Sequence, residues 1–274
     1  MRRILHLFSL ILLMVLSFSA CRKAPGGEVV GQSKQECTPE EERIIGNKLK
    51  EVIHTNQIGF PLLDTTNFSS ELVYLNRLLN TLTNTGPVLN RQNFNWNIQV
   101  ITNDEEKNLF TAPGGSFFIT TGLLKLISSE TELLSILGHE IFYVDRNYVT
   151  NALINQFGGD KLGSILLGEA VPEEVSDMTN YLQNIAYDEY TVSQADSFAI
   201  ELICPFLYDP LGMQHFLTRV RQSGDEVQVT WLDNRSTANV EDRIERVFRQ
   251  ARDCGDFGRQ YEERYHDFQE KLPE

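Results

Sequence analysis

The sequence predicts an α+β domain that is mostly helical and contains a small β-sheet. Two capping boxes, Thr38 to Glu41 and Ser129 to Glu132, each mark a helix start, because side chains at these spacings satisfy the first backbone N–H groups. Between them, apolar and polar residues alternate from Phe94 to Val100, which is the period of a half-buried strand. Helical patterns therefore flank a short region of strands.

The elements follow from these patterns in chain order. Pro39 suits the first turn of the first helix, and leucines from Leu72 to Leu82 line one face of the second, which stops at Gly86-Pro87. We expect helices over 38–54, 70–84, from 129 onwards, 172–206, 240–251 and 256–271, and strands over 94–100 and 116–120. Glycines between 158 and 168 predict a mobile crossing, and 224–235 predicts a loop or short strand.

The amino terminus predicts export and lipid anchoring. Arg2 and Arg3 precede a short apolar run, and Phe18-Ser19-Ala20-Cys21 resembles a bacterial lipobox. We expect a lipoprotein signal peptide over 1–20, a lipidated tether over 21–36 and one domain over 37–274, with lipid on Cys21. A plain signal peptide and a short membrane anchor are the alternatives, although the apolar run is short for a span.

The charge of the chain argues against nucleic acid as a partner. The whole sequence has a formal net charge of −14, and without residues 1–20 it has 22 basic and 38 acidic residues, a charge of −16. Such a chain is not attracted to phosphate backbones or to anionic lipid head groups. We therefore expect no nucleic-acid binding, and membrane contact through the lipid alone.

Three cysteines follow Cys21, and an oxidising compartment would permit one disulfide among them. Cys37 and Cys254 lie in polar segments, whereas Cys204 follows an apolar run. We expect a Cys37–Cys254 pair with a buried, inert Cys204, and three free thiols remain an alternative.

The pair His139-Glu140 is followed by Tyr143 on an apolar helix, which resembles an H-E-x-x-H zinc helix whose second histidine is missing. In that motif two histidines one turn apart bind zinc, and the glutamate activates the metal-bound water. A histidine that merely packs in a helix would be the simplest interpretation of the pair alone. The surrounding sequence blocks argue against that interpretation.

The sequence blocks follow one another along the chain in this order: Asn108 to Gly115, Thr120 to Leu124, His139-Glu140, Ala195-Asp196, Tyr208-Asp209-Pro210 and Arg243-Ile244. From about Leu72 to about Val247, the sequence resembles the zinc metallopeptidases typified by HtpX and BepA, which are CAAX-prenyl-protease-like gluzincins. The chain is similar to a degenerate member. The resemblance implies a zincin-like metallopeptidase fold with a small β-sheet.

Carried over by position, the resemblance implies that His139 is the retained metal ligand and Glu140 the general base. Tyr143 and Val192 occupy the other two ligand positions, and Asp196 is the aspartate that orients a ligand, so we expect it to hydrogen-bond His139. A later family histidine is replaced by Thr237-Ala238. Catalytic zinc needs three protein ligands, so no cofactor is expected.

We therefore expect a lipid-anchored bacterial envelope protein, with the outer membrane favoured. It would be a pseudoprotease that binds or scaffolds envelope proteins or unfolded polypeptides, by strand addition in the family's substrate groove. The main alternative is an active zinc metalloendopeptidase in envelope protein quality control, with zinc held by Tyr143 and Asp188 or Glu189. The third possibility is a scaffold protein whose function no longer involves the substrate groove.

Overall fold

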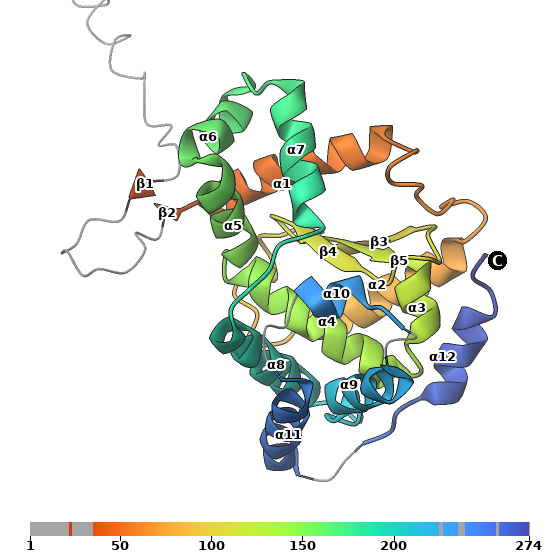
Figure 1. Cartoon of the computed structure of the whole chain (residues 1–274). Coiled ribbons are helices and arrows are strands. Elements are labelled where there is room, and N and C mark those ends of the chain that lie inside the picture. The colour runs from red at the N-terminus through yellow and green to blue at the C-terminus, as the bar shows by residue number, and fades with distance from the viewer. Residues whose placement is uncertain (1–21, 24–34, 225–226, 235–238, 256–257, 274) are drawn as a thin grey trace, which may run out of the picture.

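The computed structural model describes residues 22–23, 35–224, 227–234, 239–255 and 258–273 (Figure 1). The signal-peptide prediction, the lipidation position Cys21 and the Thr237-Ala238 substitution lie outside these residues. The assignment of residues 1–20 and 21–36 as separate segments stays a prediction.

The domain is mostly helical with a small sheet, as the sequence predicts. Its helices are α1 (Pro39–Thr55), α2 (Ser69–Thr83), α3 (Thr121–Leu126), α4 (Glu130–Asp145), α5 (Tyr148–Phe157), α6 (Gly159–Leu167), α7 (Pro172–Leu182), α8 (Glu189–Ile203), α9 (Gly212–Ser223), α10 (Thr230–Asn234), α11 (Val240–Ala251) and α12 (Glu262–Gln269). The main sheet contains β3 (Asn97–Ile101), β4 (Leu109–Ala112) and β5 (Ser116–Thr120). A two-stranded pair, β1 (Arg22–Lys23) and β2 (Gln35–Glu36), precedes them.

The strand order of the sheet is β3-β5-β4, with β3 parallel and β4 antiparallel to the central β5. Helix α4 lies beneath this sheet at the centre of the molecule, with α8, α9 and α11 on its far side (Figure 1). All sixteen residues of α4 are buried. The residues of the His139 helix therefore form the core of the domain.

Both predicted capping boxes mark helix starts. The Thr38 hydroxyl accepts from the backbone N–H of Glu41, and the Ser129 hydroxyl accepts from that of Glu132. These contacts satisfy N–H groups that have no partner inside a helix.

Several predicted elements differ from the structure. Residues 158–168 are not a crossing loop: Gly158 joins α5 directly to α6, and Gly168 ends α6 in the left-handed conformation. The predicted helix 172–206 is two helices, because Asp188 caps a new start at α8. Strand β3 begins at Asn97 rather than at 94, and the expected loop contains α10.

The predicted cysteine pairing is wrong. Cys254 forms a disulfide with Cys204, not with Cys37, so Cys204 is neither inert nor unpaired. The bond joins the end of α8 to the turn after α11, across 50 residues of sequence. It therefore holds α11 against the helix that carries Asp196.

Candidate functional site

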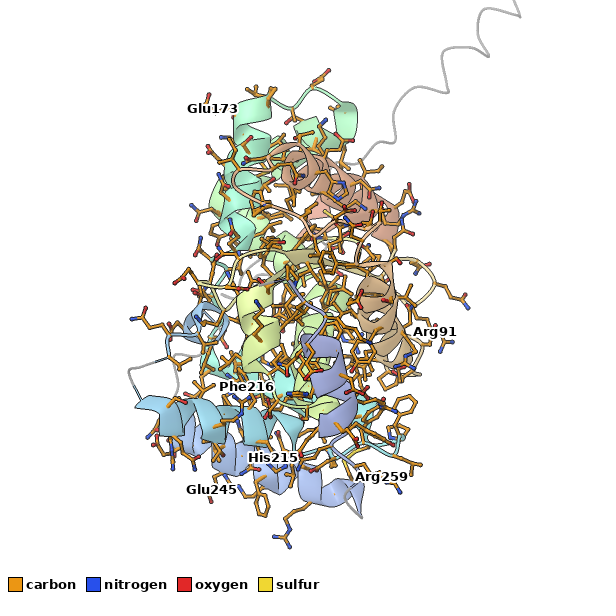
Figure 2. The ribbon with its side chains drawn as sticks, turned by 90° about the vertical axis from the view of Figure 1, so that its right-hand side faces the viewer. Arg91, Glu173, His215, Phe216, Glu245 and Arg259 are labelled. Carbon is orange, nitrogen blue, oxygen red and sulfur yellow. A yellow bond between two sulfur atoms is a disulfide. The ribbon has the colours of Figure 1, made fainter. Side chains whose placement is uncertain are left out.

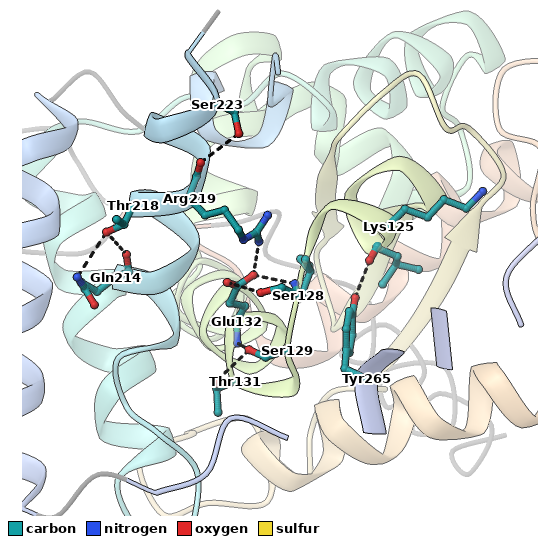
Figure 3. Close-up of polar contacts among 12 residues, drawn as sticks. Lys125, Ser128, Ser129, Thr131, Glu132, Gln214, Thr218, Arg219, Ser223 and Tyr265 are labelled. Carbon is teal, nitrogen blue, oxygen red and sulfur yellow. Dashed lines mark hydrogen bonds and ion pairs between the residues drawn. The ribbon is translucent and has the colours of Figure 1, made fainter. Parts of the chain in front are cut away.

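The amino-terminal end of α4 is fixed by two buried glutamates. Glu130 accepts from Arg264 and from the Tyr74 hydroxyl, and Glu132 accepts from Arg219. Figure 3 shows Arg219 reaching Glu132, which also accepts from the backbone and hydroxyl of Ser128. Negative charge at a helix amino terminus is favourable because the helix dipole is positive there.

Helix α4 packs closely on α8. A Cβ atom added to Gly138 would lie 3.0 Å from both the Cα and the Cβ of Ala199, so a larger residue would push the two helices apart by a few tenths of an ångström. The approach places His139, the next residue, opposite Asp196 on α8.

His139 is hydrogen-bonded at both ring nitrogens. Its Nδ1 lies 2.8 Å from Oδ1 of Asp196, which is the contact expected from the sequence, and its Nε2 lies 3.0 Å from the Tyr143 hydroxyl. Burial lowers the pKa of His139 and outweighs the opposing effect of Asp196, so the imidazole is neutral. Because ionised Asp196 can only accept, Nδ1 carries the proton and Nε2 accepts from Tyr143.

Asp196 is fully paired within the core. Arg243 donates from Nε to Oδ2 at 2.9 Å and from Nη2 to Oδ1 at 2.8 Å, and both side chains are fully buried. Burial alone would raise the pKa of Asp196, but Arg243 and His139 together hold it below its usual range. The sequence placed Arg243 in a family block but did not predict this ion pair.

Glu140 contacts a residue that the sequence analysis missed. The indole Nε1 of Trp231, on α10, donates to Oε1 of Glu140 at 2.8 Å. The Trp231 ring also meets the His139 ring edge-on, with centroids 5.5 Å apart, and all three side chains are fully buried. The available signal was a tryptophan between Val229 and Leu232, and it gave no spacing to α4.

The substituted ligand positions are both buried. Tyr143 stacks on Tyr187 with ring centroids 3.8 Å apart, and Val192 lies one turn before Asp196 on α8. Asp188 and Glu189, the alternative ligands, are exposed: Asp188 caps α8 and Glu189 lies beside Arg246. The structure therefore does not assemble the reorganised ligand set.

The residues at this site do not fit zinc. The nitrogen of His139 that would face a metal accepts a hydrogen bond from Tyr143, and valine offers no donor at position 192. Across the described ranges, the group of three side chains that could hold a metal is His266, Asp267 and Glu270, exposed on α12. That group lies outside the His139 site.

The edge of the sheet beside the site is covered by the chain itself. All of β4 is buried, and the Nδ2 groups of Asn108 and Asn234 both donate to the carbonyl of Gln183. The backbone N–H of Trp231 donates to the carbonyl of Lys107, just before β4. These contacts lie beside β4, and strand addition in the family's substrate groove stays a prediction.

Two further histidines of the described residues have polar side-chain partners away from the His139 site. His54 is exposed and contacts Gln99 through Nε2, while His215 pairs with Asp209 of the Tyr208-Asp209-Pro210 block at 3.1 Å. His215 lies at the end of the molecule opposite Glu173 (Figure 2).

No helix within the described part of the chain combines the length and apolar character that crossing a membrane requires.

Comparison with known proteins gives one matching family. The sequence profile of peptidase family M48 matches residues 73–224, which is more than half of the chain. The match covers all of α4 and α8 and ends before α10 and α11.

Three relatives illustrate the similarity. The chain is 26% identical over 132 residues to the Beta-barrel assembly-enhancing protease of Escherichia coli (strain K12), covering 44% of this chain and 27% of that protein. It is 26% identical over 199 residues to the Putative beta-barrel assembly-enhancing protease of Vibrio cholerae serotype O1, covering 61% and 41%. It is 24% identical over 119 residues to the Mitochondrial metalloendopeptidase OMA1 of Arabidopsis thaliana, covering 43% and 24%. The match thus spans about a quarter to two-fifths of each relative.

Proposed function

The chain belongs to peptidase family M48, and from that membership we propose that it is an envelope protein whose metallopeptidase-like domain binds or scaffolds other proteins without catalysis. The observation that carries the proposal is the hydrogen bond from Tyr143 to Nε2 of His139. This contact uses the lone pair that a zinc ion would need.

The electrostatics of the site support the same proposal. Asp196 has its charge compensated by Arg243, and the neutral His139 has both nitrogens paired, so these two side chains are satisfied in the absence of a cation. A catalytic zinc site normally has three protein ligands and an open position for water. Here His139, Glu140 and Tyr143 have no solvent-accessible surface.

The burial of β4 supports a protein-binding surface outside the family's substrate groove. Beside β4, the backbone N–H of Trp231 donates to the carbonyl of Lys107, and the side chain of Asn234 donates to the carbonyl of Gln183. We therefore favour a scaffold protein that binds its partners on a surface other than the substrate groove. Two relatives are named for β-barrel assembly, which favours envelope proteins or unfolded polypeptides as partners.

We further propose that lipid on Cys21 anchors the protein in the bacterial envelope, with the outer membrane favoured. The support is the lipobox-like Phe18-Ser19-Ala20-Cys21 after a short apolar run. Cys21→Ala should leave the protein unprocessed or release it from the membrane fraction. A cleaved Cys21→Ala protein that stays in the membrane would rule out the anchor.

Zinc content and proteolysis test the non-catalytic function together. Purified protein covering 22–274 should contain far less than one zinc per chain after dialysis, measured by elemental analysis. His266→Ala is the matched control, because the exposed group on α12 could hold adventitious metal. Unfolded casein should stay intact.

The active-enzyme alternative predicts a different set of results. Zinc would be stoichiometric, it would be lost on His139→Ala but not on His266→Ala, and casein cleavage would be lost on Glu140→Gln. That set would overturn the proposal, since a general base at Glu140 acts on a metal-held water.

A further inference from the structure

The outer face of α2 borders an open depression of about 720 Å³. The depression is lined by residues of α2 and its C-cap, Asn84, and by Phe206 from the turn after α8. Polar lining residues recur one helical turn apart in two neighbouring rows, Arg77 and Thr81 in one, and Asn76, Asn80 and Asn84 in the other. We call this depression the α2 groove.

The first asparagine of the α2 groove already pairs with an extended backbone. Helix α2 packs on β3, which is an edge strand of the main sheet (Figure 1). Oδ1 of Asn76 accepts from the backbone N–H of Ile98 at 3.1 Å, and Nδ2 of Asn76 donates to the Ile98 carbonyl at 3.2 Å. One side-chain amide therefore makes both hydrogen bonds that a residue of a neighbouring strand would make.

Asn80 and Asn84 present the same chemical group to the outside of the molecule. Both side chains are exposed, and the Asn80 amide forms no hydrogen bond within the described part of the chain. Asn84 donates from Nδ2 to the Asn80 carbonyl and keeps Oδ1 as an acceptor. Cβ atoms one helical turn apart are separated by about 5–6 Å, and alternate residues of an extended chain by about 6.7 Å. The two amides therefore match alternate residues of an extended polypeptide.

Arg77 adds a positive charge beside these amides, and the other described lining residues of the α2 groove are uncharged. Its guanidinium lies 5.4 Å from the centre of the Tyr74 ring. Glu71 and Asp267 line an adjoining depression, yet Arg77 forms no ion pair among the described residues. In a chain with a formal charge of −14, an unpaired arginine favours a ligand that carries a carboxylate.

The apolar lining residues of the groove are Val73 and Phe206. Val73 is 68% exposed and lies one turn before Arg77, and Phe206 is half-buried. Side chains of an extended chain point alternately to its two sides, so one set would face these residues. Nucleic acid does not fit the groove, because a single arginine neutralises too little phosphate charge.

We propose that the α2 groove binds an extended segment of an unfolded polypeptide. The backbone of the segment pairs with Asn80 and Asn84, a carboxylate pairs with Arg77, and an apolar side chain packs against Phe206. Main-chain hydrogen bonds supply affinity in this kind of recognition, and side-chain contacts supply specificity. The inference rests on the proposed protein-binding function, for which it names the surface and the conformation of the partner.

Isothermal titration calorimetry with reduced, carboxyamidomethylated α-lactalbumin, a permanently unfolded protein, tests the groove. The double change Asn80→Ala with Asn84→Ala should weaken binding severalfold, and Arg77→Gln should weaken it about tenfold, because it removes a charge-assisted hydrogen bond. Asn180→Ala on α7 and Arg249→Gln on α11 change exposed residues and are the matched controls. The controls should bind like the wild type, and all variants should keep the wild-type unfolding temperature.

Two short synthetic peptides with blocked ends isolate the carboxylate. They differ only in a central glutamate or glutamine, and each carries a phenylalanine two residues later. The glutamate peptide should bind the wild type more tightly than the glutamine peptide, and the two should bind Arg77→Gln equally. Equal binding of both peptides to the wild type would contradict the role of Arg77.

The remaining outcomes separate the groove from the proposed function. If unfolded α-lactalbumin binds the wild type, the groove variants and the controls alike, the groove is wrong and the protein-binding function stands. If it binds none of them, the inference fails, whereas zinc content and casein cleavage still decide the non-catalytic function. Chitotetraose, an uncharged glycan, should not bind. Chitotetraose binding that is lost in the double asparagine variant would make the groove a glycan site and overturn the polypeptide assignment.

Discussion

The hydroxyl of Tyr143 lies 3.0 Å from Nε2 of His139, which precedes Tyr143 by one turn of the same helix. The other ring nitrogen of His139, Nδ1, lies 2.8 Å from Oδ1 of Asp196. Tyrosine at this position therefore completes a hydrogen-bond chain from Tyr143 through His139 and Asp196 to Arg243. The position at which the H-E-x-x-H motif has its second histidine therefore supplies a hydrogen-bond donor instead of a metal ligand.

Tyr143→Phe should destabilise the domain without creating a zinc site. The change leaves Nε2 of His139 buried without a donor, which typically costs about 1–3 kcal/mol. Chemical denaturation measures the loss. Tyr190→Phe, at a 73% exposed tyrosine, should change stability by no more than about 0.5 kcal/mol. A Tyr143→Phe protein as stable as this control would contradict the role of the hydroxyl.

Arg243→Met should cost more, about 3–5 kcal/mol, because it leaves Asp196 charged and buried with His139 alone. Adding Asp196→Asn removes the uncompensated charge and should recover part of the loss. Denaturation of the single and double variants measures the coupling between the two residues. Strictly additive losses would show that the ion pair does not stabilise the core.

Glu42→Gln should stabilise the protein more at pH 8 than at pH 5. Burial is the main cause that raises the pKa of Glu42 to about 8; the hydrogen bond from Thr150 opposes the rise and the charge of nearby Asp145 adds to it. The stability linked to Glu42 is fully present below pH 4.5 and is lost as the pH rises towards 8. Since one pKa unit corresponds to about 1.4 kcal/mol, the variant should gain a few kcal/mol at pH 8.

The matched control for this change is Glu51→Gln, at an exposed glutamate on the same helix. Thermal unfolding of both variants across pH 5 to 8 is the measurement. A Glu42→Gln gain that does not grow with pH would show that this carboxyl is ionised in the folded protein.

Replacing Cys204 and Cys254 together by serine should lower stability by about 2–4 kcal/mol, because the bond closes a loop of 50 residues in the unfolded chain. Thermal unfolding measures the loss. Mass spectrometry of unreduced peptides should recover Cys204 linked to Cys254. Recovery of a Cys37–Cys254 link would instead support the pairing predicted from the sequence.

Tyr143→His with Val192→Glu should restore zinc binding. The histidine frees Nε2 of His139, and the glutamate supplies the third ligand that the family pattern implies. Elemental analysis should give about one zinc per chain, and EDTA should lower the unfolding temperature. Val192→Glu alone should be destabilised and metal-free, because it buries a carboxylate without a partner.

The sequence was sufficient to place α4, because Ser129 and Glu132 carry a local capping signal. It was also sufficient to pair His139 with Asp196, because ordered blocks fixed the register of α8 relative to α4. Both inferences depended on local patterns or on the family resemblance.

The missed features depend on tertiary contacts. Residues Leu109 to Ala112 are all buried, so β4 lacks the alternation that indicates a strand. Trp231 reaches Glu140 across 91 residues, and no spacing in the sequence links them. The glycines at 158 and 168 suggested a loop but serve as helix ends with positive φ.

The complete burial of α4 affects how mutational tolerance at His139 and Glu140 should be interpreted. Both side chains are sealed in the core and hydrogen-bonded, so most substitutions there would be selected against through misfolding and degradation. A deep mutational scan of this helix would report intolerance at both positions whether or not the protein cleaves anything. Intolerance at the His-Glu pair is therefore no signature of peptidase activity in this chain.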